Sequence, residues 1–313
     1  MDADLAHISA LASLCSTSRH LNNIATRHLY HHVRGKHWWR LARTLLARKD
    51  LAHRIRSMRI PSVTGVEEAD CPPQVVAYYD SQRKIYLDAF LGDDRDEAMF
   101  HLGDDELYKG GGNIPVEILS SLCPNLETLE SDIYYFGTFR FCAPHSMLHL
   151  RSIALSHNDT RYGMSLEHVA PLFRAAPNIT HALFCMVSSC DKLDVTLPKL
   201  ISLDFRKSTF SGSSLVDILS ACPNLKTFRY EMGSAMVGDE QFTLREARDV
   251  FLAHAPKLES LCLDTSDNEI WKEDWDEAEA SEVGGLFAER GVWLAFKPSI
   301  WGRRVRTSRP FAP

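Results

Sequence analysis

Apolar positions along the chain recur in a frame of the form L-x-x-L-x-L, in which polar residues separate the apolar ones. The frame occurs first at Ile55, Met58 and Ile60 and returns six times after residue 113. The later occurrences are Leu126 and Leu129; Leu150, Ile153 and Leu155; Ile179, Ala182 and Phe184; Leu200, Leu203 and Phe205; Leu225, Phe228 and Tyr230; and Leu258, Leu261 and Leu263. Their first positions lie 24, 29, 21, 25 and 33 residues apart, which indicates a repeated structural unit.

Each frame predicts a short β-strand. Side chains alternate across a strand, so Leu203 and Phe205 should point into the core while Asp204 and Arg206 point away from it. Helical patterns that end in a proline-containing turn separate the frames, at residues 166–176, 215–221 and 244–255. A helix that returns the chain to the start of the next strand makes successive strands parallel. The sequence therefore predicts an α/β protein with parallel strands and helical returns.

A phrase of the form Cys-Pro-Asn-Leu follows a helical stretch twice, at residues 123–126 and 222–225. The eight cysteines of the chain include no C-x-x-C pair, which is the spacing that metal and redox sites favour. We expect Cys123 and Cys222 to be small buried residues rather than ligands or redox groups. The proline then ends the helix, and the leucine begins the next strand.

Three helices are expected before the first frame. Apolar residues at three- and four-residue spacing form one stripe over residues 5–14 and another over residues 21–30. A Ser-Thr-Ser sequence between the two stripes supplies a helix cap. Residues 31–33 should form a short extended exit, and a third stripe runs from Trp38 to Leu46.

Residues 11–33 resemble the latter two-thirds of a fungal F-box. The family has a helix rich in Leu and Ser, a second helix and a closing Leu-Tyr segment. The counterparts are residues 11–25 and the sequence Arg-His-Leu-Tyr-His-His-Val at residues 27–33. The helix with the Leu-Pro-x-Glu signature that opens the family motif has no counterpart after Met1. The Cys-Pro-Asn-Leu form likewise resembles the cysteine-containing leucine-rich repeat that is common in F-box proteins.

This resemblance implies a substrate-receptor subunit of a Skp-cullin-F-box ubiquitin ligase. The residues that would bind the Skp adaptor are Leu11, Leu14, Leu21, Ile24, Leu29 and Tyr30. The leucine-rich repeats would form a solenoid whose concave face holds an unidentified protein substrate. The outward strand positions expected on that face are Thr128, Glu130, Asp132, Ser152, His181, Ser202, Asp204, Arg206, Thr227, Arg229, Glu231, Ser260 and Asp264. Arg206 and Arg229 are the basic pair among them, which gives only weak support to a phosphorylated substrate.

The alternative is a stand-alone leucine-rich-repeat interaction scaffold with no link to ubiquitin ligases. The N-terminal helices would then only cap the repeats. The missing first helix favours this alternative, because half of a docking surface rarely binds well.

The expected domain organisation has three parts. Residues 1–50 form the truncated F-box-like segment, residues 51–297 the leucine-rich-repeat domain, and residues 298–313 a basic tail that we expect to be disordered. The repeat domain contains an insertion at residues 61–113, with a helix expected at residues 74–91. The candidate core residues of that helix are Val75, Val76, Tyr79, Ile85, Tyr86 and Phe90.

The formal net charge of -6 is distributed unevenly. Residues 1–60 contain eleven Lys or Arg and three acids, whereas residues 61–140 contain five basic residues and sixteen acids. We expect these two blocks to complement one another, so nucleic acid is not an expected partner. No stretch reaches the roughly 18 apolar residues that a membrane-spanning helix requires, and no membrane association is expected.

The sequence contains no motif of a known catalytic site. It lacks a G-x-S-x-G elbow, an H-E-x-x-H pair, a Walker loop and a G-x-G-x-x-G loop. His31 and His32 are adjacent on an extended segment and face opposite ways, which makes them a poor metal chelate. We therefore expect a binding protein rather than an enzyme, with no catalytic residue, metal or cofactor. Scattered cysteines and the acidic start of the chain favour the cytoplasm or nucleus.

Overall fold

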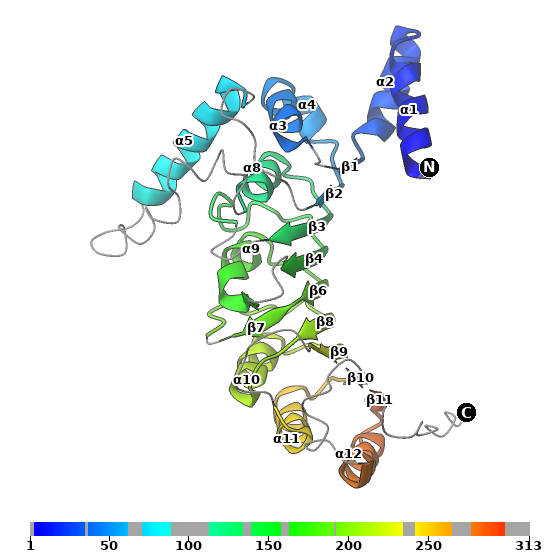
Figure 1. The fold of residues 1–313 in the computed structure, drawn as a ribbon, viewed down its shortest axis with the longest axis vertical. Helices are drawn as coiled ribbons and strands as arrows, with labels where there is room; N and C mark the ends of the chain where they lie inside the picture. Colours follow the sequence, from blue (N-terminus) through cyan, green and yellow to red (C-terminus); the bar gives the residue numbers. More distant parts are fainter. Residues whose placement is uncertain are drawn as a thin grey trace. The chain divides into compact units, whose positions relative to one another are not determined.

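The computed structural model describes residues 3–34, 37–61, 71–88, 113–133, 139–157, 163–190, 192–233, 242–264 and 277–297. In these residues the protein is an α/β fold with a nine-stranded parallel sheet (Figure 1). The strands follow one another in the sheet in the order β1 (His32–Arg34), β2 (Ser57–Ile60), β3 (Thr128–Ile133), β4 (Ser152–His157), β6 (His181–Cys185), β8 (Ser202–Ser208), β9 (Thr227–Met232), β10 (Ser260–Asp264) and β11 (Trp293–Lys297). The prediction of parallel strands with helical returns is confirmed.

Helices connect the strands of the sheet. The described helices are α1 (Ala3–Cys15), α2 (Arg19–Leu29), α3 (Trp38–Ala47), α4 (Lys49–Ala52), α5 (Pro73–Asp88), α8 (Ile114–Leu122), the 3-10 helix η2 (Leu166–Val169), α9 (Ala170–Ala175), α10 (Gly212–Ala221), α11 (Leu244–His254) and α12 (Glu277–Glu289). A separate pair of short parallel strands is formed by β5 (Met164–Ser165) and β7 (Val187–Ser189). The N-terminal helices and the extended exit at residues 31–33 are thus present as predicted.

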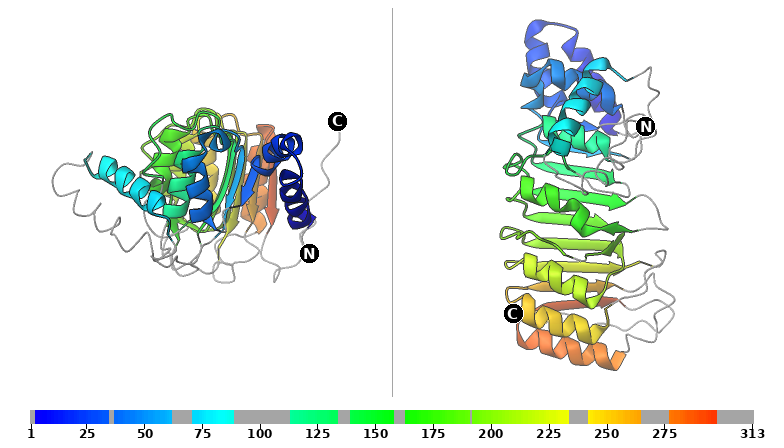
Figure 2. Two further views of the ribbon diagram at one scale, coloured as in Figure 1. Left: turned by 90° about the horizontal axis from the view of Figure 1, so that it is seen from above. Right: turned by 90° about the vertical axis from the view of Figure 1, so that its left-hand side faces the viewer.

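The chain forms two compact units. The described residues of unit 1 fall within Met1–Ile153 and Pro171–Asn178, and those of unit 2 within Ala154–Ala170 and Ile179–Pro313. In unit 1, α1 packs against α2, and α3 packs against both α5 and α8. In unit 2, α10, α11 and α12 lie side by side on one face of the strands (Figure 2).

The apolar residues of all seven frames are buried, and none is more than 7% exposed. In unit 2 they support a continuous row of aromatic rings. Phe184 stacks on Phe205, which contacts Phe228, and the row continues to Phe251 of α11 and Phe287 of α12. Centroid distances of 4.8–6.4 Å along the row are those of favourable ring pairs. The frame residues therefore form the core that joins the sheet to its helices.

A turn of constant geometry precedes the strands. The N–H of the first frame residue donates to the carbonyl three residues earlier, for example from Leu126 to Cys123 and from Leu225 to Cys222, each at 3.2 Å. The same bond joins Ile55 to Ala52, Leu150 to Met147, Leu200 to Leu197, and Leu258 to Ala255. Cys123 and Cys222 are 0% and 2% exposed, which confirms that the motif cysteines are core residues.

Successive turns are joined by a shared acceptor. The carbonyl of Lys226 accepts the N–H groups of both Glu259 and Ser260, at 2.7 and 2.9 Å. The carbonyls of His31, Arg56, Glu127, Thr180 and Ile201 each accept two N–H groups from the following strand entry in the same way. Since buried backbone groups must be paired, this repeated bond sets the register at which each strand joins the next.

The insertion at residues 61–113 contains the expected helix, but one of its predicted core residues is exposed. The expected helix at residues 74–91 is present as α5, and Val75 and Tyr79 are buried as predicted. The prediction that Ile85 is a core residue is wrong, because its side chain is 65% exposed. Helical spacing alone does not say which residues of an apolar stripe contact another element. The side chains of Tyr86 and Phe90 and the tail at residues 298–313 lie outside the described residues.

No helix among the described residues is both long and apolar enough to cross a membrane. The predicted boundaries at residues 50 and 297 stay predictions.

Candidate binding surfaces

Outward positions of the unit 2 strands come into register in rows across the sheet. The first row contains His181, Ser202, Thr227, Ser260 and Trp293 on β6, β8, β9, β10 and β11. Its members are exposed or half-buried, and the indole of Trp293 is 56% exposed. Two residues further along each strand, a second row places Asp204 of β8 beside Arg229 of β9. Parallel pairing thus brings together polar side chains that are more than twenty residues apart in sequence.

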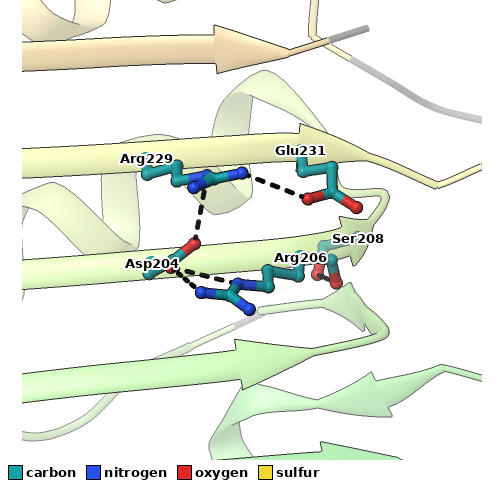
Figure 3. A network of polar contacts seen from close by, with 5 residues as sticks. All are labelled: Asp204, Arg206, Ser208, Arg229 and Glu231. Carbon is teal, nitrogen blue, oxygen red and sulfur yellow. Dashed lines mark hydrogen bonds and ion pairs between the residues drawn. The ribbon is translucent and has the colours of Figure 1, made fainter. Parts of the chain in front are cut away.

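Four of these side chains form a network of ion pairs on β8 and β9 (Figure 3). Arg206 donates from Nε and Nη2 to Oδ2 of Asp204, at 3.2 and 3.0 Å. The other oxygen, Oδ1, lies 3.8 Å from Nε of Arg229, and Nη2 of Arg229 lies 3.5 Å from Oε2 of Glu231. We call Asp204, Arg206, Arg229 and Glu231 the β8–β9 charge network.

The carboxylates of the network are less exposed than its guanidinium groups. The side chains of Asp204 and Glu231 are 20% and 17% exposed, whereas those of Arg206 and Arg229 are 46% and 37% exposed. The hydrogen bond to Asp204 is the main cause that raises the pKa of Arg206, so this guanidinium is held in its charged form. The carboxylates therefore orient the arginines from beneath, and a molecule approaching the face meets guanidinium groups first.

A β-bulge shapes the end of β8. The pairing of β8 with β9 shifts register between Phe205 and Ser208, and Lys207 has a φ of 47°. As a result the consecutive residues Arg206 and Lys207 are both exposed instead of alternating. Gly233 passes close to the bulge, since a Cβ atom at this glycine would lie 2.6 Å from the carbonyl oxygen of Lys207. The bulge adds a third cation to the surface beside the network.

Sequence reasoning placed most of the outward residues of unit 2 correctly, with one error. Asp264 occupies an outward register position on β10 but is only 4% exposed, so it is not part of an accessible face. In the sheet it is paired with Glu231 of β9 and with Lys297 of β11. Trp293 and Lys207 were missed, because the last strand has no L-x-x-L-x-L frame and a bulge leaves no pattern in the sequence.

The outward positions of unit 1 form a smaller surface. His32, Ser57 and Thr128 share one register row of β1, β2 and β3, and Arg34, Arg59 and Glu130 share another. Nε of Arg59 lies 3.1 Å from Oε1 of Glu130. Both members of this pair are more than half exposed, so it contributes little to stability. The remaining expected positions, Asp132 of β3 and Ser152 of β4, are half-buried.

The α1–α2 hairpin carries the second candidate surface. Ser18 caps α2 by accepting a hydrogen bond from the N–H of Leu21, as the Ser-Thr-Ser sequence predicts. Leu14, Leu21 and Ile24 are 41%, 37% and 47% exposed, although they are large apolar side chains. The other positions expected to meet an adaptor, Leu11, Leu29 and Tyr30, are half-buried. The structure thus exposes three of the six.

A cavity of about 330 Å³ lies within unit 1, beside α2 and α4. It is lined by Cys15, Asn22, Asn23, Thr26, Leu29, Tyr30, Arg48, Asp50, Leu51 and Arg54. Burial raises the pKa of the Tyr30 hydroxyl, which therefore stays protonated. Leu29 and Tyr30 line this cavity, whereas Leu14, Leu21 and Ile24 of the hairpin are exposed to solvent.

No protein-family model matches the chain, and no curated protein is significantly similar to it. Any functional proposal for this protein therefore depends on its own residues and contacts.

Unit 1 contains a buried ion pair that includes a residue of α8. Glu117 of α8 is 1% exposed, and its Oε1 lies 3.5 Å from Nε of Arg140, which is itself 9% exposed. Burial raises the pKa of Glu117 to about 7, against the opposing effects of Arg140 and of backbone N–H groups of Phe139 and Arg140. This pair lies inside unit 1 and joins α8 to the segment that follows β3.

The described residues show no constellation for metal binding. No group of three or more His, Cys, Asp or Glu side chains among them is close enough to hold a metal ion. All eight cysteines are free, and burial raises the pKa of Cys123 and Cys222 to about 12. Such thiols stay protonated at neutral pH, and only thiolates ligate metals or attack disulfides.

Proposed function

We propose that this protein is an F-box-type substrate-receptor subunit of a Skp-cullin-F-box ubiquitin ligase. The α1–α2 hairpin would bind the Skp adaptor, and through it the cullin complex. The outward face of the strands would hold a protein substrate. The observation that carries the proposal is the exposure of Leu14, Leu21 and Ile24 on a helical hairpin that precedes a series of parallel turn-and-strand units.

The exposed side chains matter because of their number and position. Single exposed apolar residues are normal on a soluble protein. Three on one short hairpin, at the positions where the F-box resemblance implies adaptor contacts, are typical of a surface that another protein covers. Burying the exposed part of each would stabilise a complex at about 25 cal/mol per Å² of apolar surface.

The strand array supports the receptor half of the proposal. Seven frames with the same buried positions, six of them with the same turn hydrogen bond, favour a leucine-rich-repeat solenoid. Proteins of this architecture bind other proteins along their strand faces, so the role proposed is binding rather than catalysis. A cytoplasmic or nuclear location would fit this role.

A stand-alone interaction scaffold is the second candidate, and one observation favours it. Leu29 and Tyr30 line the unit 1 cavity, and Leu11 is half-buried. Half of the expected adaptor surface is therefore used for packing within the chain. In this case α1 and α2 would cap the strands, and the protein would bind its partner without a ubiquitin ligase.

Co-expression of the full chain with a Skp adaptor separates the two candidates. The receptor function predicts a stable complex in size-exclusion chromatography, which Ile24→Asp or Leu14→Asp would abolish. Leu148→Asp is the matched control, because Leu148 lies in a turn of unit 1 and is as exposed as Ile24, at 47%. A soluble, folded chain that does not bind the adaptor would reject the receptor function and leave the scaffold.

A further inference from the structure

The outward face of unit 2 has a positive surface although its charged side chains nearly balance. Arg206, Lys207 and Arg229 carry three positive charges, and Asp204 and Glu231 carry two negative ones. The carboxylates are the less exposed members, and each is held against an arginine. With the buried Asp264 of β10 counted as a third negative charge, these groups sum to zero, but the groups that a docking molecule meets first are the exposed guanidinium and ammonium groups. Charge complementarity points to an acidic partner.

An aromatic side chain lies on the same face. Trp293 of β11 is in the same register row as Ser260, Thr227 and Ser202, so the sheet surface between it and β8 carries short side chains. Arg229 lies two strands across and two residues along from Trp293, and Arg206 three strands across and four residues along. At about 4.8 Å per strand and about 3.3 Å per residue these separations are about 12 and about 20 Å. Tryptophan and arginine are the residues that most often supply the binding energy of protein interfaces. This face presents both with no bulky outward side chain between them.

We infer that this face docks an unphosphorylated acidic segment of a partner protein. Its Asp or Glu side chains would pair with Arg206 and Arg229, and an apolar side chain would lie on Trp293. An extended chain advances about 3.3 Å per residue, so the acidic residues that pair with Arg229 and Arg206 would be about four and about six positions from the apolar residue. The inference rests on the proposed function, since it names the class of substrate that the receptor takes.

The network favours a carboxylate over a phosphate. Phosphate dianions bind where several unengaged guanidinium groups converge. Arg206 and Arg229 each already contact a carboxylate, and Asp204 and Glu231 remain close to any new anion. The donors already directed at Asp204 and Glu231 are not available to the three acceptor oxygens of a phosphate group. A single carboxylate needs only the free edge of one guanidinium group.

The test uses the full chain without an adaptor and three synthetic peptides, with fluorescence anisotropy as the readout. The first peptide has consecutive glutamates and a tyrosine four positions away, in a Gly-Ser background. The second has lysines in place of the glutamates, and the third has phosphoserines. We expect the glutamate peptide to bind, the lysine peptide not to bind, and the phosphoserine peptide to bind no more tightly than the glutamate peptide. Binding should weaken with salt, because the paired charges are at the surface.

Variants then locate the site. Arg206→Gln and Arg229→Gln should each weaken binding of the glutamate peptide about tenfold, the loss of one charge-assisted contact. Trp293→Ala should weaken it by a similar factor. Arg43→Gln is the matched control, because Arg43 is an exposed arginine on α3 in the other unit. Arg206 lies at the surface, so we expect Arg206→Gln to keep the wild-type melting curve. An unchanged curve would show that a loss of binding is not a loss of folding.

Three results with the glutamate peptide would overturn the inference. These are equal binding of the glutamate and lysine peptides, wild-type affinity in both arginine variants, and no binding of the glutamate peptide by the folded chain. Binding of the phosphoserine peptide alone would also overturn it and would indicate a phosphate receptor. None of these outcomes bears on the adaptor complex. Conversely, a chain that binds the glutamate peptide but no Skp adaptor loses only the ubiquitin-ligase function.

Discussion

The side-chain amide of Asn224 donates a hydrogen bond of 2.7 Å to the carbonyl oxygen of Pro198, in the turn before the preceding strand. Asn125 makes the same bond to His53 at 2.9 Å, and Asn178 makes it to Leu148 at 2.8 Å. At these three turns the asparagine that precedes the first frame residue thus ties the turn to the one before it. It satisfies a carbonyl that no strand partner reaches.

Replacing Asn224 with Ala should lower the free energy of unfolding by about 1 kcal/mol, because its bond to the carbonyl of Pro198 and the exposed bond that its Oδ1 accepts from Lys257 are both lost. His149→Ala is the control, since His149 occupies the same turn position but is exposed and has no such bond. Urea unfolding of both variants measures the difference. Equal midpoints would show that the asparagine bond does not contribute.

Gly233→Ala should destabilise the protein by about 1–3 kcal/mol, the usual cost of forcing an extra methyl group into a filled space. The new Cβ would lie 2.6 Å from the carbonyl oxygen of Lys207, so the backbone at residue 233 or at Lys207 would have to move. Thermal melting measures the change. Gly285→Ala provides a control of opposite sign, because it meets no atom within 4 Å and replaces a glycine inside α12, where alanine favours the helix.

The ionisation of Glu117 should make stability fall as pH rises from about 4.5 to about 7. Its folded pKa is raised above the ordinary value, so over this range the folded chain keeps a proton that the unfolded chain has released. One proton gives a slope of at most about 1.4 kcal/mol per pH unit. Above pH 7 the carboxylate is charged in both states and the slope ends.

Glu117→Gln removes this titration while keeping a polar side chain in the same space. The difference in unfolding free energy between the variant and the wild type should therefore shift in favour of the variant as pH rises from 4.5 to 7. Glu127→Gln serves as the control, because Glu127 is about half exposed beside Arg56. A pH-independent difference for Glu117→Gln would mean that Arg140 holds the carboxylate ionised throughout.

The buried cysteines should resist alkylation in the folded chain. Cys123, Cys142 and Cys222 are buried and have thiols with a pKa raised to about 12, whereas Cys185 and Cys262 are only half-buried. Treatment with iodoacetamide followed by mass spectrometry should show modification of the second group first. Labelling of Cys222 as fast as Cys262 would contradict a structural role for the motif cysteine.

The positions of the strands could be predicted because the signals for them are local. Alternation of apolar and polar residues places Leu203 and Phe205 inside regardless of what surrounds the strand, and the structure buries both. The turn chemistry is equally local, since Pro ends the helix and a small cysteine fits beneath the turn. The function of the motif asparagine was not visible, because its acceptor lies in the preceding turn, 26 residues away in the case of Asn224.

The sequence by itself determined which residues face the core and which face outward, because burial on a strand follows from the two-residue period. Only the tertiary structure decided which outward residues meet. Asp204 lies beside Arg229 because parallel pairing aligns β8 with β9, and Arg206 and Lys207 are exposed together because a bulge interrupts that pairing. The same pairing brings Trp293 into line with Ser260, and the fold buries Asp264. Register between strands is a property of the assembled sheet, and it determines the surface on which a partner would dock.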